Sequence, residues 1–252
     1  CQVKIEKDQE IICGINVIET VLNLRPGSAK TLFVLDSKSN SRIKKILSSA
    51  KTNQIAISFK TKDFFSNYFG DQNHQGLALL CNKRIEEQES FLDNLLEKDS
   101  LFLLVLDHIT DPHNVGACLR SAAAANVDAV IVPKNRSCHL TPTVRKVSSG
   151  GSELVPFVVV TNLVRTIKKM KLSNVNMVGA EKNGEMDYKE LVLEKKNALI
   201  IGSEDKGLKK LTAENCDTLI RVDLPGGVES LNASVACGIL LFEFVSKSEN
   251  FI

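Results

Sequence analysis

The stretch LFLLVLDHITDPHNVGACLRSAAAAN, residues 101–126, decides the fold class of this chain. Its first six residues are apolar throughout, and a strand of that composition has both faces covered, as in a parallel sheet flanked by helices. A turn follows, and the nearly uncharged segment Val115–Asn126 then predicts a helix. A buried strand followed by a helix is the repeating unit of α/β folds, so we expect that class.

The same alternation continues to the end of the chain. Further strands are expected at Ala129–Val132, Val155–Val160, Asn176–Gly179, Ala198–Ile201 and Thr218–Val222. Further helices are expected at Thr143–Ser149, Leu163–Lys171, Lys206–Glu214 and Leu231–Val245. Residues 100–252 are therefore predicted to form one α/β domain, in which helices flank a parallel sheet.

Residues 1–82 have the pattern of a separate, smaller α/β domain. Its helices are expected at Gly14–Leu24, Ser41–Lys51 and Lys62–Tyr68, and its strands at Thr31–Leu35, Gln54–Phe59 and Gly76–Cys81. Residues 83–99 carry six acidic against three basic side chains. This change in composition predicts a linker between the two domains.

Basic residues are concentrated in the smaller domain. Between Arg25 and Lys62 there are nine lysines and arginines against one acid, Asp36, although the whole chain has a net charge of only +2. Such a surface suits contact with phosphates. A solvated basic face with no partner is the alternative that charge alone leaves open.

Several function classes are disfavoured by composition. No apolar run reaches the roughly 20 residues that span a bilayer, and the polar first ten residues do not suit a signal peptide, so we expect a cytoplasmic protein. The seven cysteines are scattered, odd in number and without a Cys-x-x-Cys pair. We therefore expect reduced core thiols, and neither disulfides nor a metal site.

Two residues of the 101–126 stretch are candidates for function. Asn114 stands where a helix N-cap is expected, and capping is its structural interpretation. Arg120 is the sole charge in VGACLRSAAAA, residues 115–125. A helix without a polar face is expected to be buried all round, so a guanidinium there requires anionic or polar partners. Those partners are either an acid in a structural ion pair, or a phosphate or a reacting group at the carboxyl edge of the sheet.

Two later segments also place polar residues beyond strand ends. In ALIIGSEDKGL, residues 198–208, a buried strand runs into a loop that carries Glu204. In IRVDLPGGVESLNASVACG, residues 220–238, a strand breaks at Pro-Gly-Gly, and Ser230 or Asn232 is expected to cap an apolar helix. An irregular loop ahead of an apolar helix suits a pocket for a ligand with an apolar body and a few polar contacts.

Taken together, NVGACLRSA, IIGSEDKGL and VESLNASVACGI resemble the SpoU (TrmH) family of RNA ribose 2′-O-methyltransferases, within the SPOUT superfamily. The first half, opening with ICGINVIETVLN and closing with HQGLAL, is similar to the ribosomal-protein-L30e-like domain of members that act on large-subunit rRNA. The resemblance implies that the parallel sheet forms a deep trefoil knot, which no propensity argument would predict. It also implies a homodimer whose catalytic domains pack helix against helix.

The resemblance further implies a binding site for S-adenosyl-L-methionine. Gly202, Val222, Leu224 and Leu231 match the cofactor-binding positions. The polar active-site positions correspond to Asn114, Arg120, Glu204, Ser230 and Asn232, and no metal is implied. The arginine is either the general base or a clamp on a neighbouring phosphate. A guanidinium is normally always protonated, which favours the clamp.

The expected function is therefore 2′-O-methylation of a guanosine in 23S rRNA or in a precursor of the large ribosomal subunit. A tRNA ribose methyltransferase of the same family is one alternative, and the additional first domain argues against it. A non-catalytic RNA-binding or ribosome-assembly protein is another. Retention of Arg120, Glu204, Ser230 and Asn232 together argues against that alternative.

Overall fold

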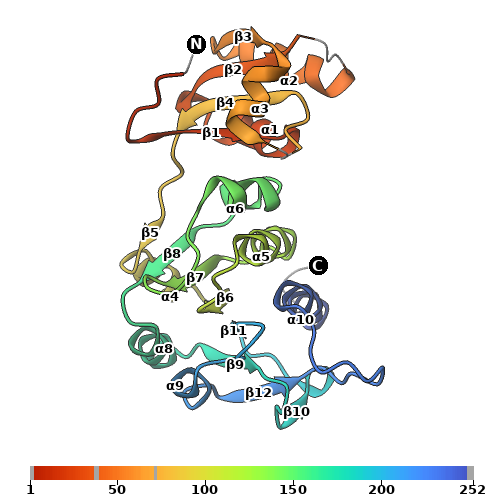
Figure 1. Cartoon of the computed structure of the whole chain (residues 1–252). Coiled ribbons are helices and arrows are strands. Elements are labelled where there is room, and N and C mark those ends of the chain that lie inside the picture. The colour runs from red at the N-terminus through yellow and green to blue at the C-terminus, as the bar shows by residue number, and fades with distance from the viewer. Residues whose placement is uncertain (1–2, 37–39, 71–72, 249–252) are drawn as a thin grey trace.

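The computed structural model describes residues 3–36, 40–70 and 73–248, which form two sheets of different size (Figure 1). The first is four-stranded and has the order β1-β4-β2-β3. β2 and β3 are parallel, and the other two pairings are antiparallel. Its strands are β1(Gln9–Cys13), β2(Ala29–Leu35), β3(Ala56–Lys60) and β4(Leu77–Asn82).

Helices cover both faces of this small sheet. Alternate residues of its strands point to opposite sides, which produces two separate apolar clusters. α1(Ile15–Leu24) and α2(Ser41–Thr52) pack on one side, whereas α3(Lys62–Phe69) packs on the other. A short 3-10 helix, η1(Pro26–Ser28), follows α1. The expected α/β unit is present, together with one strand that the sequence patterns missed, β1.

The second sheet has eight strands in the order β10-β12-β9-β11-β6-β7-β8-β5. Every pairing in it is parallel, as the apolar strand composition predicted. All seven residues of β6, at its centre, are buried. Its strands are β5(Glu87–Gln88), β6(Leu101–Asp107), β7(Ala129–Pro133), β8(Phe157–Val160), β9(Asn176–Ala180), β10(Met186–Asp187), β11(Lys196–Gly202) and β12(Thr218–Arg221).

Helices cover both faces of the large sheet as well, so the predicted α/β class is confirmed. One face packs against α5(Pro112–Ala124), α6(Pro142–Val147) and α10(Ala233–Lys247). The other packs against α4(Phe91–Leu96), α8(Leu163–Leu172) and α9(Lys210–Ala213). The short α7(Gly151–Leu154) and the 3-10 helix η2(Tyr188–Glu190) complete the set within the described residues. The trefoil knot that the family resemblance implies stays a prediction.

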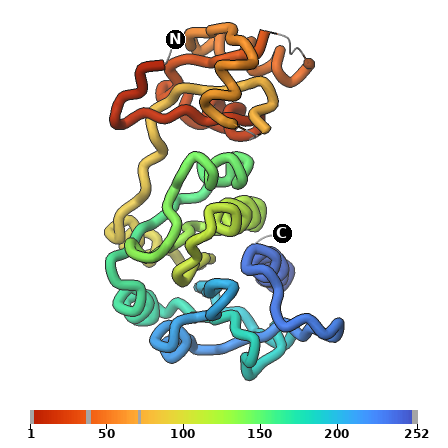
Figure 2. The backbone as a smooth tube through the Cα atoms, viewed as in Figure 1, coloured from red at the N-terminus to blue at the C-terminus, as the bar shows by residue number. Residues whose placement is uncertain are grey.

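The chain passes once from the upper unit to the lower one, through the segment predicted as a linker (Figure 2). Part of that segment joins the large sheet, because β5 pairs with β8 and α4 buries Leu92, Leu95 and Leu96 against it. Glu89 also accepts a hydrogen bond from the Thr166 hydroxyl at 2.9 Å. This end of the segment is therefore fixed to the large sheet.

The six cysteines within the described residues are free thiols. Cys118 of α5 and Cys237 of α10 are both fully buried. The pKa of Cys237 lies well above its ordinary value because of its hydrogen bond with Cys118 and its burial. Cys1 lies outside the described residues. No helix formed by the described residues is both long and apolar enough to cross a membrane.

Candidate active site

The candidate site lies at the carboxyl edge of the large sheet. Because β6, β9, β11 and β12 are parallel, their last residues meet at this edge, and the loops that follow them lie side by side. The helices α5 and α10 both begin here. Open parallel sheets bind ligands at this edge, where loop backbone groups are not used by the sheet.

Three of the predicted polar residues meet in one cluster. The Asn232 side-chain Nδ2 donates to Asn114 Oδ1 at 2.9 Å and to Glu204 Oε2 at 3.0 Å. Asn232 is also the N-cap of α10, since its Oδ1 accepts from the Ser234 backbone N–H at 3.0 Å. The Asn232 side chain therefore caps α10 with its oxygen and binds Asn114 and Glu204 with its nitrogen.

Asn114 is not a helix cap, and the cap interpretation was wrong. α5 begins at Pro112, and Asp111 caps it by accepting from the N–H groups of His113 and Asn114 at 3.0 and 3.3 Å. Proline is favoured in the first helical turn because it needs no N–H partner there and its φ is already helical. The Asn114 side chain is thereby left to bind Asn232.

A cavity of about 410 Å³ opens beside this cluster. All four predicted cofactor residues line it, together with two predicted polar residues: Gly202, Val222, Leu224, Leu231, Glu204 and Ser230. Sequence patterns had not singled out several other lining residues, including Ala180, Glu181, Lys182, Ile220, Ala236 and Leu240. A volume of roughly 300–1,000 Å³ is typical of small-molecule sites.

A tight loop forms one wall of the cavity. Ser203 and Gly207 exchange two backbone hydrogen bonds, of 3.1 and 2.8 Å, so the loop closes on itself. A Cβ at Gly202 would lie 2.1 Å from the Gly207 carbonyl carbon, which leaves no room for a side chain. Gly207 itself has a φ of +63°, a conformation that favours glycine.

Glu181 supports this loop and was missed by sequence reasoning. Its Oε1 accepts from the Leu208 backbone N–H at 2.6 Å. The available signal was its position, since it is the first charged residue after a predicted strand, at the same edge as Glu204. Because parallel strands end at one common edge, a polar residue that directly follows any of them is a candidate for the site.

Arg120 does not line the cavity, and the expectation that it is buried was wrong. It is exposed on α5, on the same side as Ala117 and Ala124, and it has no ion pair among the described residues. The helix lacks a polar face as predicted, but part of its apolar side is not covered by this chain. Neighbouring α10 likewise exposes Val235 and Ile239, at 50% and 38%.

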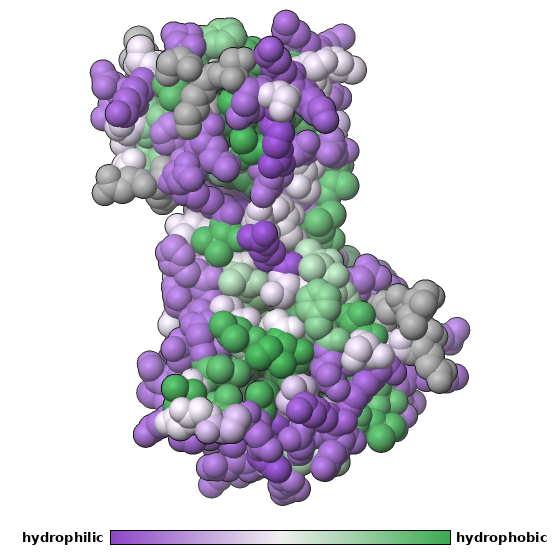
Figure 3. All heavy atoms as spheres, turned by 90° about the vertical axis from the view of Figure 1, so that its right-hand side faces the viewer, coloured by the Kyte–Doolittle hydropathy of each residue, from purple (hydrophilic) through white to green (hydrophobic). Residues whose placement is uncertain are grey.

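These helix faces contribute to an apolar surface on one side of the molecule (Figure 3). Phe242 of α10 is 51% exposed and continues the stripe of Val235 and Ile239. Residues spaced by three and four lie on one face of a helix. A contiguous apolar patch rimmed by polar residues is typical of a protein–protein contact.

A second cavity, of about 380 Å³, lies at the opposite edge of the sheet, where β6 and β11 begin, and Leu101 and Asn197 are among its lining residues. None of the predicted site residues lines it. We place the site at the carboxyl edge, because the polar cluster and the loop ends of the parallel strands meet there. Within the described residues, no three His, Cys, Asp or Glu side chains are grouped so as to hold a metal ion.

Comparison with known proteins identifies the family to which both parts of the chain are similar. The family described as SpoU rRNA Methylase matches residues 101–242, and the one described as RNA 2′-O ribose methyltransferase substrate binding matches residues 11–86. The 23S rRNA (guanosine-2′-O-)-methyltransferase RlmB of Escherichia coli (strain K12) is 38% identical over 239 residues, 94% of this chain and 98% of its own. The protein of that name from Coxiella burnetii is 40% identical over 240 residues, 94% and 96%.

A solved structure also resembles the whole chain. The SpoU methyltransferase AviRb from Streptomyces viridochromogenes, in complex with AdoMet, superposes with a TM-score of 0.76. The superposition covers 95% of this chain and 90% of that one, at 20% sequence identity. At 20% identity this similarity shows a shared fold only, and the shared fold includes both the small and the large sheet.

Proposed function

The chain belongs to the SpoU rRNA methylase family, and from this we infer that it transfers a methyl group from S-adenosylmethionine to the ribose 2′-oxygen of a guanosine in 23S rRNA. The observation that supports this function best is how much of the chain matches relatives of that activity. Relatives named for this activity match both the small and the large sheet, over nearly their entire length. We propose the cytoplasm as its place of action.

The cavity suits this cofactor in size and in lining. We propose that Gly202, Val222, Leu224 and Leu231 hold S-adenosylmethionine there. When bound, it supplies a methyl group on a sulfonium sulfur, which is already reactive. The protein therefore has mainly to align the ribose oxygen with that methyl group and to assist the loss of the hydroxyl proton.

We propose Asn114, Arg120, Glu204, Ser230 and Asn232 as the active-site set. The Asn232 amide orients Glu204 by binding its Oε2, which leaves Oε1 as an acceptor for a ribose hydroxyl. The same amide orients Asn114. A guanidinium is a poor proton acceptor and a good phosphate ligand, so we assign Arg120 to binding an RNA phosphate and not to accepting a proton.

We propose a homodimer that forms through the exposed faces of α5 and α10. A second copy would cover Val235, Ile239 and Phe242, which are otherwise exposed to water. It would also cover the part of the apolar side of α5 that this chain leaves uncovered, at Ala117 and Ala124. Sedimentation equilibrium measures this, and a protein that stays monomeric at micromolar concentration contradicts it.

Mapping ribose methylation in rRNA tests the proposed function. In cells that lack this protein, one 23S guanosine is expected to lose its 2′-O-methyl group, and expression of the protein is expected to restore it. Purified protein with labelled S-adenosylmethionine should modify the same position. Loss of a tRNA methyl group instead would support the tRNA alternative, and no loss at any position would support the non-catalytic one.

We propose residues 1–82 as the RNA-binding domain, residues 83–99 as the linker and residues 100–252 as the catalytic domain. On α2, Lys44 and Lys45 are exposed, with no partner among the described residues. Arg42, by contrast, pairs with Glu19 at 2.8 Å and is already partly neutralised. The lysines are therefore better candidates for phosphate contact than Arg42.

Replacing Lys44, Lys45 and Lys51 by alanine is expected to weaken RNA binding and its dependence on salt. Each lost phosphate contact should reduce the log–log salt slope by about 0.7–0.9, because fewer counterions are released on binding. Filter binding across a salt series measures the slope. Alanine at Lys168 and Lys195, which are exposed on the large unit, is the matched control. Equal slopes in all three proteins would assign RNA binding to another surface.

A further inference from the structure

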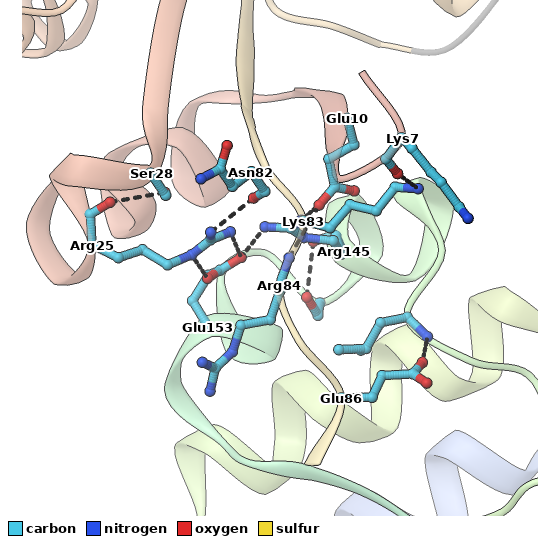
Figure 4. A network of polar contacts seen from close by, with 12 residues as sticks. Lys7, Glu10, Arg25, Ser28, Asn82, Lys83, Arg84, Glu86, Arg145 and Glu153 are labelled. Atoms are coloured by element: carbon cyan, nitrogen blue, oxygen red, sulfur yellow. Dashed lines mark hydrogen bonds and ion pairs between the residues drawn. The ribbon is translucent and has the colours of Figure 1, made fainter. Parts of the chain in front are cut away.

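A buried network of charges joins the small sheet to helices α6 and α7 (Figure 4). Arg145 of α6 forms ion pairs with Glu10 of β1 and with Glu153 of α7. Arg25, which follows α1, donates from Nε to Glu153 Oε2 at 2.7 Å. Each unit contributes one acid and one base, so the network is neutral and crosses the boundary twice.

These charges are withdrawn from water. The side chain of Arg145 is 1% exposed, and that of Glu153 is 0% exposed. Burial alone would raise the pKa of the Glu153 carboxyl, but hydrogen bonds from Arg25 and the charge of Arg145 outweigh it and hold that pKa below its usual range. The carboxylate is therefore ionised and depends on both arginines. Removing one partner of such a buried pair is strongly unfavourable.

Two further contacts hold the units closely together. The Asn16 side-chain Nδ2, on α1, donates to Ser149 Oγ at 2.6 Å. A Cβ at Gly150 would lie 2.4 Å from Thr20 Oγ1 of α1, so only glycine permits this approach. Gly150 also has a φ of +98°.

The helices that receive the small unit also hold α5. A Cβ at Gly116 of α5 would lie 2.6 Å from Val147 Cβ of α6. A Cβ at Gly151 of α7 would lie 2.7 Å from the Leu119 carbonyl oxygen and 3.1 Å from Arg120 Cα. The Gly151 backbone therefore packs directly on the backbone of α5, and the Gly116 backbone packs on the short, branched side chain of Val147. Contacts packed this closely have low compressibility, so a displacement of α6 or α7 is passed on to α5.

We propose that Arg145 is a positioning residue: with Glu10, Arg25 and Glu153, it fixes the RNA-binding unit on α6 and α7 and thereby sets which ribose is presented to the catalytic edge. The inference rests on the proposed function. RNA held on the small unit is kept at a constant distance from α5, which carries Asn114 and Arg120. The selected nucleotide then depends on this distance as well as on contacts at the cavity.

Substituting Arg145→Met tests the proposal, since methionine keeps much of the volume and removes the charge. The KM for rRNA is expected to rise at least tenfold and methylation to spread to other nucleotides, while affinity for S-adenosylhomocysteine stays within about twofold of wild type. Arg165→Met is the matched control, because Arg165 is 66% exposed and pairs with Glu89 on the surface. A variant with normal KM and a single methylated position would overturn the proposal.

A cross-link tests the same proposal without disturbing the buried network. Cysteines replacing Asn16 and Ser149 stand where the two side chains already touch, so oxidation or a short thiol-reactive linker can join them. The cross-linked protein is expected to methylate the same nucleotide at the wild-type rate. If its activity is lost and reduction restores it, the units must move apart during turnover and the proposal is wrong. Methylation by unmodified wild-type protein separately tests the proposed function.

Discussion

Replacing Arg120 by alanine is expected to lower methyl transfer to rRNA by roughly 100-fold or more, the effect of removing one group that stabilises a transition state. Affinity for S-adenosylhomocysteine should not change, because Arg120 does not line the cavity. The fold should also persist, since the side chain is exposed in the single chain. Transfer of a labelled methyl group and calorimetry measure the two quantities.

The Arg120→Lys variant separates the two roles of this arginine. A phosphate clamp needs positive charge, so lysine should recover part of the rate, but not all of it, because it lacks the planar fork of the guanidinium. Lys168→Ala, which removes an exposed charge on α8, is the control and should be as active as wild type. Near-normal turnover of Arg120→Ala would remove Arg120 from the active site.

Replacing Gly202 by alanine is expected to weaken S-adenosylhomocysteine binding by roughly 30-fold. The added Cβ would meet the Gly207 backbone at 2.1 Å, so the loop must open and lose the two hydrogen bonds between Ser203 and Gly207. Each such bond stabilises by about 1 kcal/mol. Since about 1.4 kcal/mol corresponds to a tenfold change in affinity, the two together give this estimate.

The matched control for Gly202→Ala is Gly226→Ala, in the next loop of the same edge. A Cβ there has no atom within 4 Å, so affinity should stay at the wild-type level. Calorimetric titration measures both variants, and circular dichroism checks that both are folded. If Gly202→Ala binds as tightly as Gly226→Ala, the loop of residues 203–207 is not a wall of the cofactor site.

Most elements of the fold could be predicted because their signals are local. Apolar runs such as residues 101–106 predicted buried parallel strands, and every strand expected in the large sheet is present. β1 was missed because only three of its five residues, Ile11 to Cys13, form an apolar run. The neighbouring Glu10 carboxylate is buried because it pairs with Arg145, which lies 135 positions away. No pattern of neighbouring residues could reveal that partner.

For the candidate site, the sequence alone determined which loops carry the polar residues, since each follows a strand with a clear pattern. Tertiary structure decided which of them meet. Asn232 joins Asn114 across 118 positions and Glu204 across 28, and these contacts exist only because parallel strands end at a common edge. It also decided which arginine is buried. Arg120, in an apolar helix, is exposed, whereas Arg145, beside Lys146, is enclosed. Burial of a charge depends on partners distant in sequence, and folding alone brings them together.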